Sequence, residues 1–146
     1  MTKARTQVQI DALTNKRLLK TYGITLAEYD RMCATHDGVC WICSKPPGKV
    51  RLSVDHDHAV NRVKVRTEKA STGQWGAEAI YKGILYVCHN KKRGLAIKEV
   101  KGYLKRASVR GILCSWCNRG LRYYRDNPEF MKKAAEYLER HQGVQT

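Results

Sequence analysis

Two pairs of cysteines, each with the spacing Cys-x-x-Cys, place the strongest constraint on how this chain can fold. The first pair is Cys40 and Cys43, and the second pair is Cys114 and Cys117. Four thiolates presented as two short-spaced pairs are the usual ligands of a structural zinc ion, which they surround as a tetrahedron. One ion bound by all four would close the long loop 44–113 and hold two distant segments together.

Disulfide bonds are the alternative use for six cysteines in a short chain. The first five residues, Met1 to Arg5, lead into a polar segment without the apolar core of a secretion signal. No stretch approaches the length of apolar residues that a membrane span needs. These observations favour a reducing cytoplasm, where such pairs bind metal more often than they form disulfides. We therefore expect a zinc site.

The net charge of the chain indicates a polyanionic partner. Lys and Arg number 28 against 13 Asp and Glu, a formal charge of +15. This excess is larger than a small domain needs for solubility. Nucleic acid is the foremost polyanion for such a protein. Binding to a membrane would call for a basic amphipathic helix with a bulky apolar face, and none is evident.

Hydrophobic periodicity predicts helices near both ends. Apolar residues at helical spacing predict a helix over about residues 8–22. A capping box formed by Thr25 and Glu28 opens a second helix, which we expect to stop near Gly38. The C-terminal helix is predicted over 126–142, because an Asn-Pro pair supplies an N-cap and a first helical residue.

The middle of the chain alternates short apolar and polar runs. Val50–Val54 and Arg110–Leu113 each predict a short strand, and a helix should follow the second. Between them, strands are predicted at Val63–Arg66 and Ile80–Val87 and a helix at Lys98–Arg106. Cys33 is expected in the core, and Cys88-His89 to be a strand cysteine beside a surface histidine.

A second group of polar residues lies between and after the cysteine pairs. Asp55, His56 and His58 form an Asp-His-x-His sequence, and Asn118 directly follows Cys117. One carboxylate and one amide oxygen suit a hard divalent ion that keeps positions for water and phosphate. A neutral imidazole is the natural base near neutral pH. We assign Asp55 and Asn118 to a divalent ion, and His56 to the base. His58 is expected either to contact the phosphate or to orient the base.

The strand geometry limits how these residues can act together. Successive side chains of a regular strand point to opposite faces. Asp55 and His56 can therefore serve one site only if the strand breaks or twists between them.

These motifs resemble the phage recombination endonuclease VII family, within the HNH or ββα-metal nucleases. The resemblance covers roughly residues 20–58 and 109–140. It rests on five stretches: Tyr22-Gly23-Ile24-Thr25 with Glu28-Tyr29, Gly38 to Cys43, Val54 to His58, Val109 to Asn118, and Asp126-Asn127-Pro128-Glu129 with Ala134 to Leu138.

The resemblance implies a β-hairpin followed by a helix, with zinc beside it. It also implies that Asp55 and Asn118 bind Mg²⁺ or Mn²⁺ and that His56 is the general base. The expected fold is α+β, a single domain over 1–146. Its predicted parts are N-terminal helices (8–38), a zinc and ββα core (39–58 and 109–125), a basic insertion of about 50 residues (59–108) and a C-terminal helix (126–142).

Two departures from the family pattern affect the expected substrate and site. The family joins its two motif strands by a short turn, whereas this chain has residues 59–108. The sequence after Asn118 is basic and has no acidic residue before Asp126, so a carboxylate that some members use there is not visible. Residues expected to contact DNA phosphates are Lys91, Lys92, Arg93, Lys98, Lys101, Lys105, Arg106, Arg119 and Arg122.

The sequence therefore predicts a metal-dependent DNA endonuclease in the host cytoplasm. The resemblance favours branched DNA such as Holliday junctions, which require paired nicks and hence a homodimer. The first two helices and the last one are the expected dimer surfaces. The alternatives are nicking of ordinary duplex DNA, as in homing or packaging, and a zinc module that binds DNA without cutting it.

Overall fold

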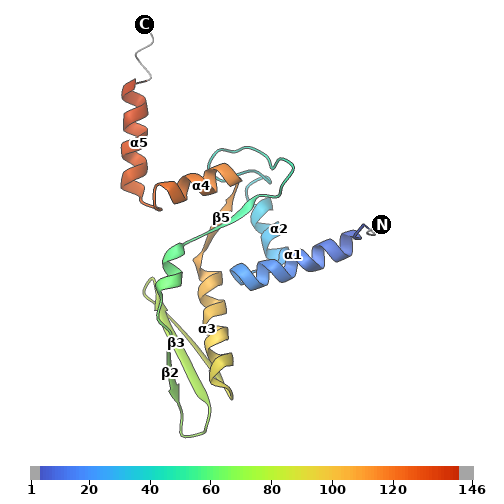
Figure 1. Ribbon diagram of the computed structural model, residues 1–146, viewed down its shortest axis with the longest axis vertical. Coiled ribbons are helices and arrows are strands. Elements are labelled where there is room, and N and C mark those ends of the chain that lie inside the picture. Colours follow the sequence, from blue (N-terminus) through green and yellow to red (C-terminus); the bar gives the residue numbers. More distant parts are fainter. Residues whose placement is uncertain (1–3, 142–146) are drawn as a thin grey trace.

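The computed structural model describes residues 4–141 and has mixed α and β structure, as predicted. In Figure 1, α1, α2, β1 and β5 lie together, and β2, β3 and α3 form a second group below them. The elements in chain order are α1 (Gln7–Tyr22), α2 (Leu26–Ala34), β1 (Ser53–His56), the 3₁₀ helix η1 (His58–Arg62), β2 (Arg66–Lys69), β3 (Trp75–Tyr81), β4 (Ile84–Asn90), α3 (Arg93–Ser108), β5 (Val109–Leu113), α4 (Ser115–Tyr123) and α5 (Pro128–His141).

The N-terminal helices begin and end where their capping residues require. Thr25 and Glu28 form the predicted capping box of α2, each side chain bonded to the other residue's backbone N–H. α1 ends at Gly23, whose φ of 71° is left-handed and favours glycine. α2 is shorter than predicted, because it stops at Ala34 and residues 35–38 form turns.

β1 and β5 pair antiparallel at the centre of the first group. Val54 lies opposite Ile112, and both are buried. Gly111 on β5 leaves room for an aromatic ring, because a Cβ added there would lie 2.7 Å from Trp41. The two strands and the N-terminal helices share one core of Leu18, Ile24, Tyr29, Cys40, Leu52, Val54, Ile112 and Leu113.

Residues 58–108, comprising η1, β2, β3, β4 and α3, are here termed the sheet–helix unit. The three strands are antiparallel in the order β2-β3-β4. α3 extends the predicted helix in both directions and packs on β3 and β4. The unit has its own core of Val60, Ala77, Ala79, Tyr81, Cys88, Ala96, Val100 and Leu104. Cys88 is thus a buried strand residue, and His89 beside it is exposed, as predicted.

The strand prediction for Ile80–Val87 is wrong, because this run contains a hairpin turn. Lys82 and Gly83 have φ of 51° and 78°, so both are left-handed. Two such residues in succession make the turn whose twist matches paired antiparallel strands. The strand predicted at Val63–Arg66 begins later, at Arg66–Lys69.

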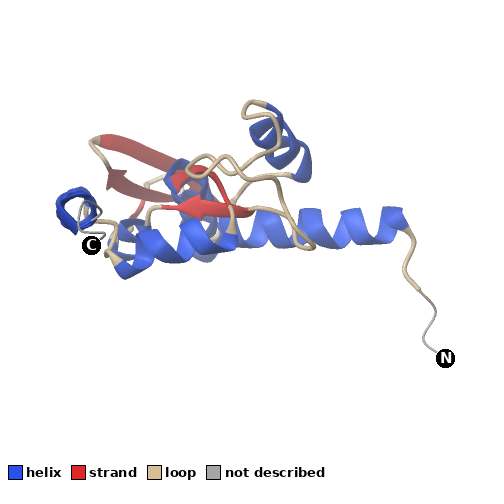
Figure 2. Cartoon of the chain, turned by 90° about the horizontal axis from the view of Figure 1, so that it is seen from above, coloured by secondary structure: helices blue, strands red, loops and turns tan. Residues whose placement is uncertain are grey.

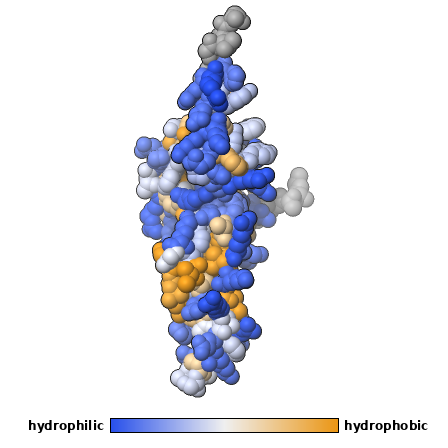
Figure 3. All heavy atoms as spheres, turned by 90° about the vertical axis from the view of Figure 1, so that its left-hand side faces the viewer, coloured by the Kyte–Doolittle hydropathy of each residue, from blue (hydrophilic) through white to orange (hydrophobic). Residues whose placement is uncertain are grey.

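The sheet face turned away from α3 is partly apolar. The orange area in the lower half of Figure 3 lies on the side of the molecule where the sheet is found. On this face the exposed apolar residues of β3 and β4 are Ile80, Leu85 and Val87, because Ile80 pairs with Leu85 and the buried Ala79 and Tyr81 point to the other face.

Loops and the C-terminal helices complete the chain. The loop 35–52, part of the tan segments in Figure 2, has no helix or strand and carries the first cysteine pair. α5 begins at Pro128 as predicted, with the Asn127 side chain accepting from two backbone N–H groups. α5 projects away from the other elements in Figure 1. Residue 142, its predicted end, lies outside the described range.

No helix within residues 4–141 has the length and apolar character for crossing a membrane.

Candidate active site and metal centre

The structure gathers the four predicted zinc ligands into one cluster. The Sγ atoms of Cys40, Cys43, Cys114 and Cys117 all lie within 4.8 Å of one another. Cys40 is fully buried, and Cys43 Sγ is 3.8 Å from Cys114 Sγ. Burial opposes ionisation of Cys40, but backbone N–H donors, led by that of Cys43, outweigh it and lower its pKa to about 6. The cluster therefore has the ligand type and spacing of a structural zinc site.

Local helix geometry explains how the second pair joins the cluster. Cys114 is the N-cap of α4, and its Sγ accepts from the backbone N–H of Cys117 at 3.4 Å. The first turn of α4 thus turns both sulfur atoms toward the loop that carries Cys40 and Cys43. The same turn places Asn118 one residue after the last ligand, with its backbone N–H bonded to the Cys114 carbonyl.

The predicted irregularity at the Asp-His sequence is confirmed. Asp55 pairs with Gly111, but His56 pairs with Val109, so Arg110 of β5 is the extra residue of a bulge. β1 runs from Ser53 to His56, so it begins and ends later than the strand predicted at Val50–Val54. The bulge increases the local twist and frees the Arg110 side chain to turn back across the strand pair.

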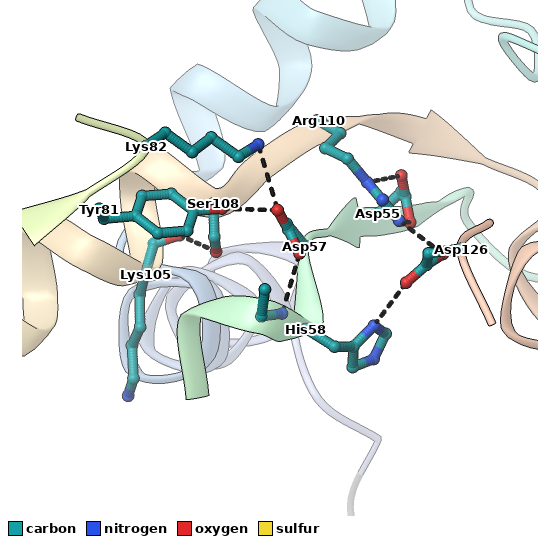
Figure 4. Close-up of polar contacts among 10 residues, drawn as sticks. Asp55, Asp57, His58, Tyr81, Lys82, Lys105, Ser108, Arg110 and Asp126 are labelled. Carbon is teal, nitrogen blue, oxygen red and sulfur yellow. Dashed lines mark hydrogen bonds and ion pairs between the residues drawn. The ribbon is translucent and has the colours of Figure 1, made fainter. Parts of the chain in front are cut away.

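Arg110 forms a two-pronged ion pair with the buried Asp55. Its Nε donates to Asp55 Oδ2 at 2.8 Å, and its Nη2 donates to Oδ1 at 2.9 Å. The same Nη2 donates to Asp126 Oδ1 at 3.1 Å, and Asp126 Oδ2 lies 3.3 Å from Nδ1 of His58. Figure 4 shows the resulting chain of contacts from Asp55 through Arg110 and Asp126 to His58. The Asp55 side chain is 7% exposed, whereas the His58 side chain is 51% exposed, so this series of contacts leads from the interior to the surface.

His56 lies beside this chain of contacts in an aromatic environment. Its ring centroid is 5.3 Å from that of Tyr22 and 4.6 Å from that of His58. Partial burial, the neighbouring His58 and Arg110 lower the pKa of His56, and the nearby carboxylates only partly oppose them. A lowered pKa keeps the imidazole neutral near pH 7, which is the state that can accept a proton.

Asn118 reaches the neighbourhood of the site through helix α4. This helix packs against β1 and β5, and the Asn118 side chain is partly exposed. Among residues 4–141, however, the Asn118 amide makes no hydrogen bond with Asp55 or His56. The structure therefore brings Asp55, His56 and His58 together and leaves Asn118 on the adjoining helix.

Comparison with known families decides the relationship of the chain. Residues 15–140 match the family model described as recombination endonuclease VII. The chain belongs to this family. It is 34% identical over 124 residues to the Gene 59 protein of Mycobacterium phage L5, covering 84% of this chain and 48% of the relative. It is 31% identical over 131 residues to the Gene 59 protein of Mycobacterium phage D29, covering 88% and 52%.

This endonuclease VII family member spans about half the length of both curated relatives. No solved structure matches it.

Asp126 is the residue that reasoning from the sequence missed. It lies in the turn between α4 and α5, where Arg125 and Asp126 have left-handed φ of 55° and 52°. Non-glycine residues in this region carry a conformational cost and concentrate at functional sites. One signal in the sequence could have pointed to Asp126: it is the first acidic residue after Asn118, the position near which some family members use an additional carboxylate. The structure brings a carboxylate to the same cluster from farther along the chain.

The basic residues predicted to bind DNA are exposed, but some have internal partners. In the last turn of α3, Lys105 Nζ donates to the Lys20 carbonyl at 2.8 Å, and Arg106 pairs with Glu28. The Arg119 guanidinium lies 4.8 Å from the Trp116 ring centroid. Arg93 Nε donates to Thr67 Oγ1 at 3.1 Å, and its guanidinium lies 5.6 Å from the Trp75 ring centroid. Within residues 4–141, the predicted DNA-binding residues whose exposed side chains make no hydrogen bond, ion pair or cation–π contact are Lys91, Lys92, Lys98, Lys101 and Arg122.

Proposed function

We propose that this chain is an HNH-type, metal-dependent endonuclease that hydrolyses phosphodiester bonds of DNA. The observation that carries the proposal is the meeting of Asp55, His56 and His58 on one strand end beside a four-cysteine cluster, in a chain of the recombination endonuclease VII family. The antiparallel pair of β1 and β5, followed by α4, supports assignment to the ββα-metal class. The charge of +15 suits a DNA substrate.

Asp55 and Asn118 would hold the Mg²⁺ or Mn²⁺ ion. A carboxylate has about four acceptor positions, and Arg110 uses one on each oxygen of Asp55. The two hydrogen bonds from Arg110 therefore fix the plane of the Asp55 carboxylate, as hydrogen bonds to metal-binding carboxylates commonly do. They leave lone pairs on both oxygens that an ion could use. Such an ion supplies charge stabilisation to the phosphate and to the leaving oxygen.

His56 accepts the proton of the attacking water in this mechanism. Its lowered pKa keeps it neutral, and its contacts with Tyr22 and His58 restrict the ring. His58 is the more exposed imidazole, so it is the one that can approach a DNA phosphate. Asp126 orients His58 through Nδ1 and balances the charge of Arg110. The zinc ligands fix the start of α4 and thereby the position of Asn118.

Branched DNA, including Holliday junctions, is the proposed substrate. Paired nicks across a junction need two sites, so we propose a homodimer that acts in the cytoplasm. Supporting features are the exposed apolar residues of the terminal helices, of which Leu13, Phe130, Tyr137 and Leu138 are 45% to 58% exposed. We further propose that 1–146 acts as one domain, in which residues 59–108 are an insertion that contacts phosphates.

Cleavage of a four-way junction beside a linear duplex of the same sequence tests this proposal. In Mg²⁺, the wild type should cut the junction, and His56→Ala should cut neither DNA while its melting temperature stays near the wild-type value. His89→Ala is the matched control, because His89 is exposed on β4 outside the site. Equal cutting by His56→Ala and His89→Ala would refute the assignment of the base. Cutting of the duplex alone would favour a nicking enzyme. Binding of DNA without cutting would favour a zinc module that is not a nuclease.

A further inference from the structure

Asp57 lies between the two histidines of the proposed active site, but its side chain points away from them. In Figure 4 its carboxylate faces the sheet–helix unit, while His58 turns toward Asp126. Asp57 Oδ1 accepts from the backbone N–H of Ala59 at 2.8 Å, which caps η1. Its Oδ2 contacts two side chains that are distant in sequence.

Both distant partners sit at the tip of the β3–β4 hairpin. The Tyr81 hydroxyl donates to Asp57 Oδ2 at 3.0 Å, and Lys82 Nζ lies 3.1 Å from the same oxygen. The charge of Asp57 is thus balanced within the hairpin contact, which argues against Asp57 as a ligand of the divalent ion.

The hairpin tip is anchored in the core of the sheet–helix unit through Tyr81. Tyr81 is 5% exposed and belongs to the core of the sheet–helix unit, so only its hydroxyl reaches outward. Lys82 and Gly83 form the tight two-residue turn between the strands. The unit therefore sets the position of the Tyr81 hydroxyl and of the Lys82 backbone.

The sheet–helix unit is itself fixed to the first group of elements at further points. The Asp57 backbone N–H donates to the Ser108 carbonyl at 2.8 Å. Lys105 donates to the carbonyl of Lys20 at the end of α1. A Cβ added at Gly23 would lie 2.8 Å from the Gly102 carbonyl oxygen, so α1 and α3 approach closely there. These contacts hold the unit against the segment that carries the histidines.

We propose that the sheet–helix unit positions the active site through Asp57, with Tyr81 and Lys82 as positioning residues that hold the turn carrying His58. This inference rests on the proposed nuclease function. Residues 59–108 would then be part of the catalytic apparatus, in addition to contacting DNA. The competing explanation is that Asp57 only caps η1, in which case its contacts with the hairpin have no consequence for cutting.

Lys82→Met separates these explanations, because it removes the ion pair and leaves the Ala59 cap intact. Lys64→Met is the matched control: it removes the same charge from the same unit, and Lys64 makes no ion pair within residues 4–141. Single-turnover cutting should slow by about ten- to a hundred-fold in Lys82→Met, the usual cost of a small misplacement of reacting groups. The DNA concentration for half-maximal rate should match that of Lys64→Met. Lys82→Arg should restore most of the rate.

A second variant and a second readout keep the inference separate from the nuclease proposal. Tyr81→Phe removes the other hydrogen bond without changing the packing of the ring. In ¹⁵N NMR spectra, the His58 and Ala59 amide signals should shift in Lys82→Met and Tyr81→Phe, but not in Lys64→Met. If the wild type cuts no DNA, the nuclease proposal fails, and these shifts still test the contact. If Lys82→Met cuts as fast as Lys64→Met, or its amide signals are unchanged, the inference is wrong.

Discussion

Replacing Cys114 with serine should unfold one part of the molecule and spare the other. Serine is itself a good N-cap, so Cys114→Ser keeps the start of α4 and removes a metal ligand. The cross-link between the cysteine pairs spans 71 residues from Cys43 to Cys114. Closing a loop of that length contributes about 4 kcal/mol by the chain-entropy model for cross-links.

This amount is a large share of the stability of an ordinary domain, about 5–15 kcal/mol. The core that contains Cys40, Val54 and Ile112 should lose this stability. The sheet–helix unit has a core of its own with none of the four clustered cysteines, so it should keep its structure. The expected result is a partly folded protein in which the two cores no longer unfold together.

Amide hydrogen exchange, with zinc content measured on the same sample, tests this expectation. Val54 and Ile112 should lose most of their protection in Cys114→Ser, whereas Ala79 and Val100 should retain theirs. Cys33→Ser is the control, since Cys33 lies outside the four-cysteine cluster. Bound zinc at the wild-type level together with unchanged protection at Val54 and Ile112 would refute the reasoning.

Three further predictions concern the backbone, the base and the missed carboxylate. Gly23→Ala should lower the free energy of unfolding in urea more than Gly38→Ala does. Both glycines have a left-handed φ, so alanine should cost about 1 kcal/mol at either position. Only at Gly23 would the added Cβ also meet a close backbone atom. Equal losses would contradict this. Because burial and neighbouring positive groups lower the pKa of His56, its basic form persists to lower pH, and the acid limb of kcat/KM should lie below about pH 6.5. A limb above pH 7 would exclude His56 as the base. Asp126→Asn should slow cutting relative to Asp37→Asn, another left-handed aspartate, and equal rates would remove Asp126 from the site.

The sequence by itself determined the features that depend on residue type and short spacing. The Thr25 capping box and the Asn127 cap follow from interactions within a few residues, and both are present in the structure. The spacing of the two cysteine pairs predicted the four-cysteine cluster, which the structure also contains. The need for an irregularity beside Asp55 also followed from the two-residue period of a strand. The turn at Lys82-Gly83 was missed because its residues interrupt an apolar run only briefly, and lysine is an uncommon residue at a left-handed position.

Only the tertiary structure decided which distant side chains complete the site. Arg110 reaches Asp55 because the bulge lies in β5, and strand register across 55 residues is set by packing and not by local sequence. Asp126 reaches His58 across 68 residues because the left-handed turn after α4 places its carboxylate beside Arg110 and His58. Asp57 meets Lys82 because α3 holds the hairpin against the first core. In each case the contact depends on how whole elements pack, which short-range patterns in the sequence do not specify.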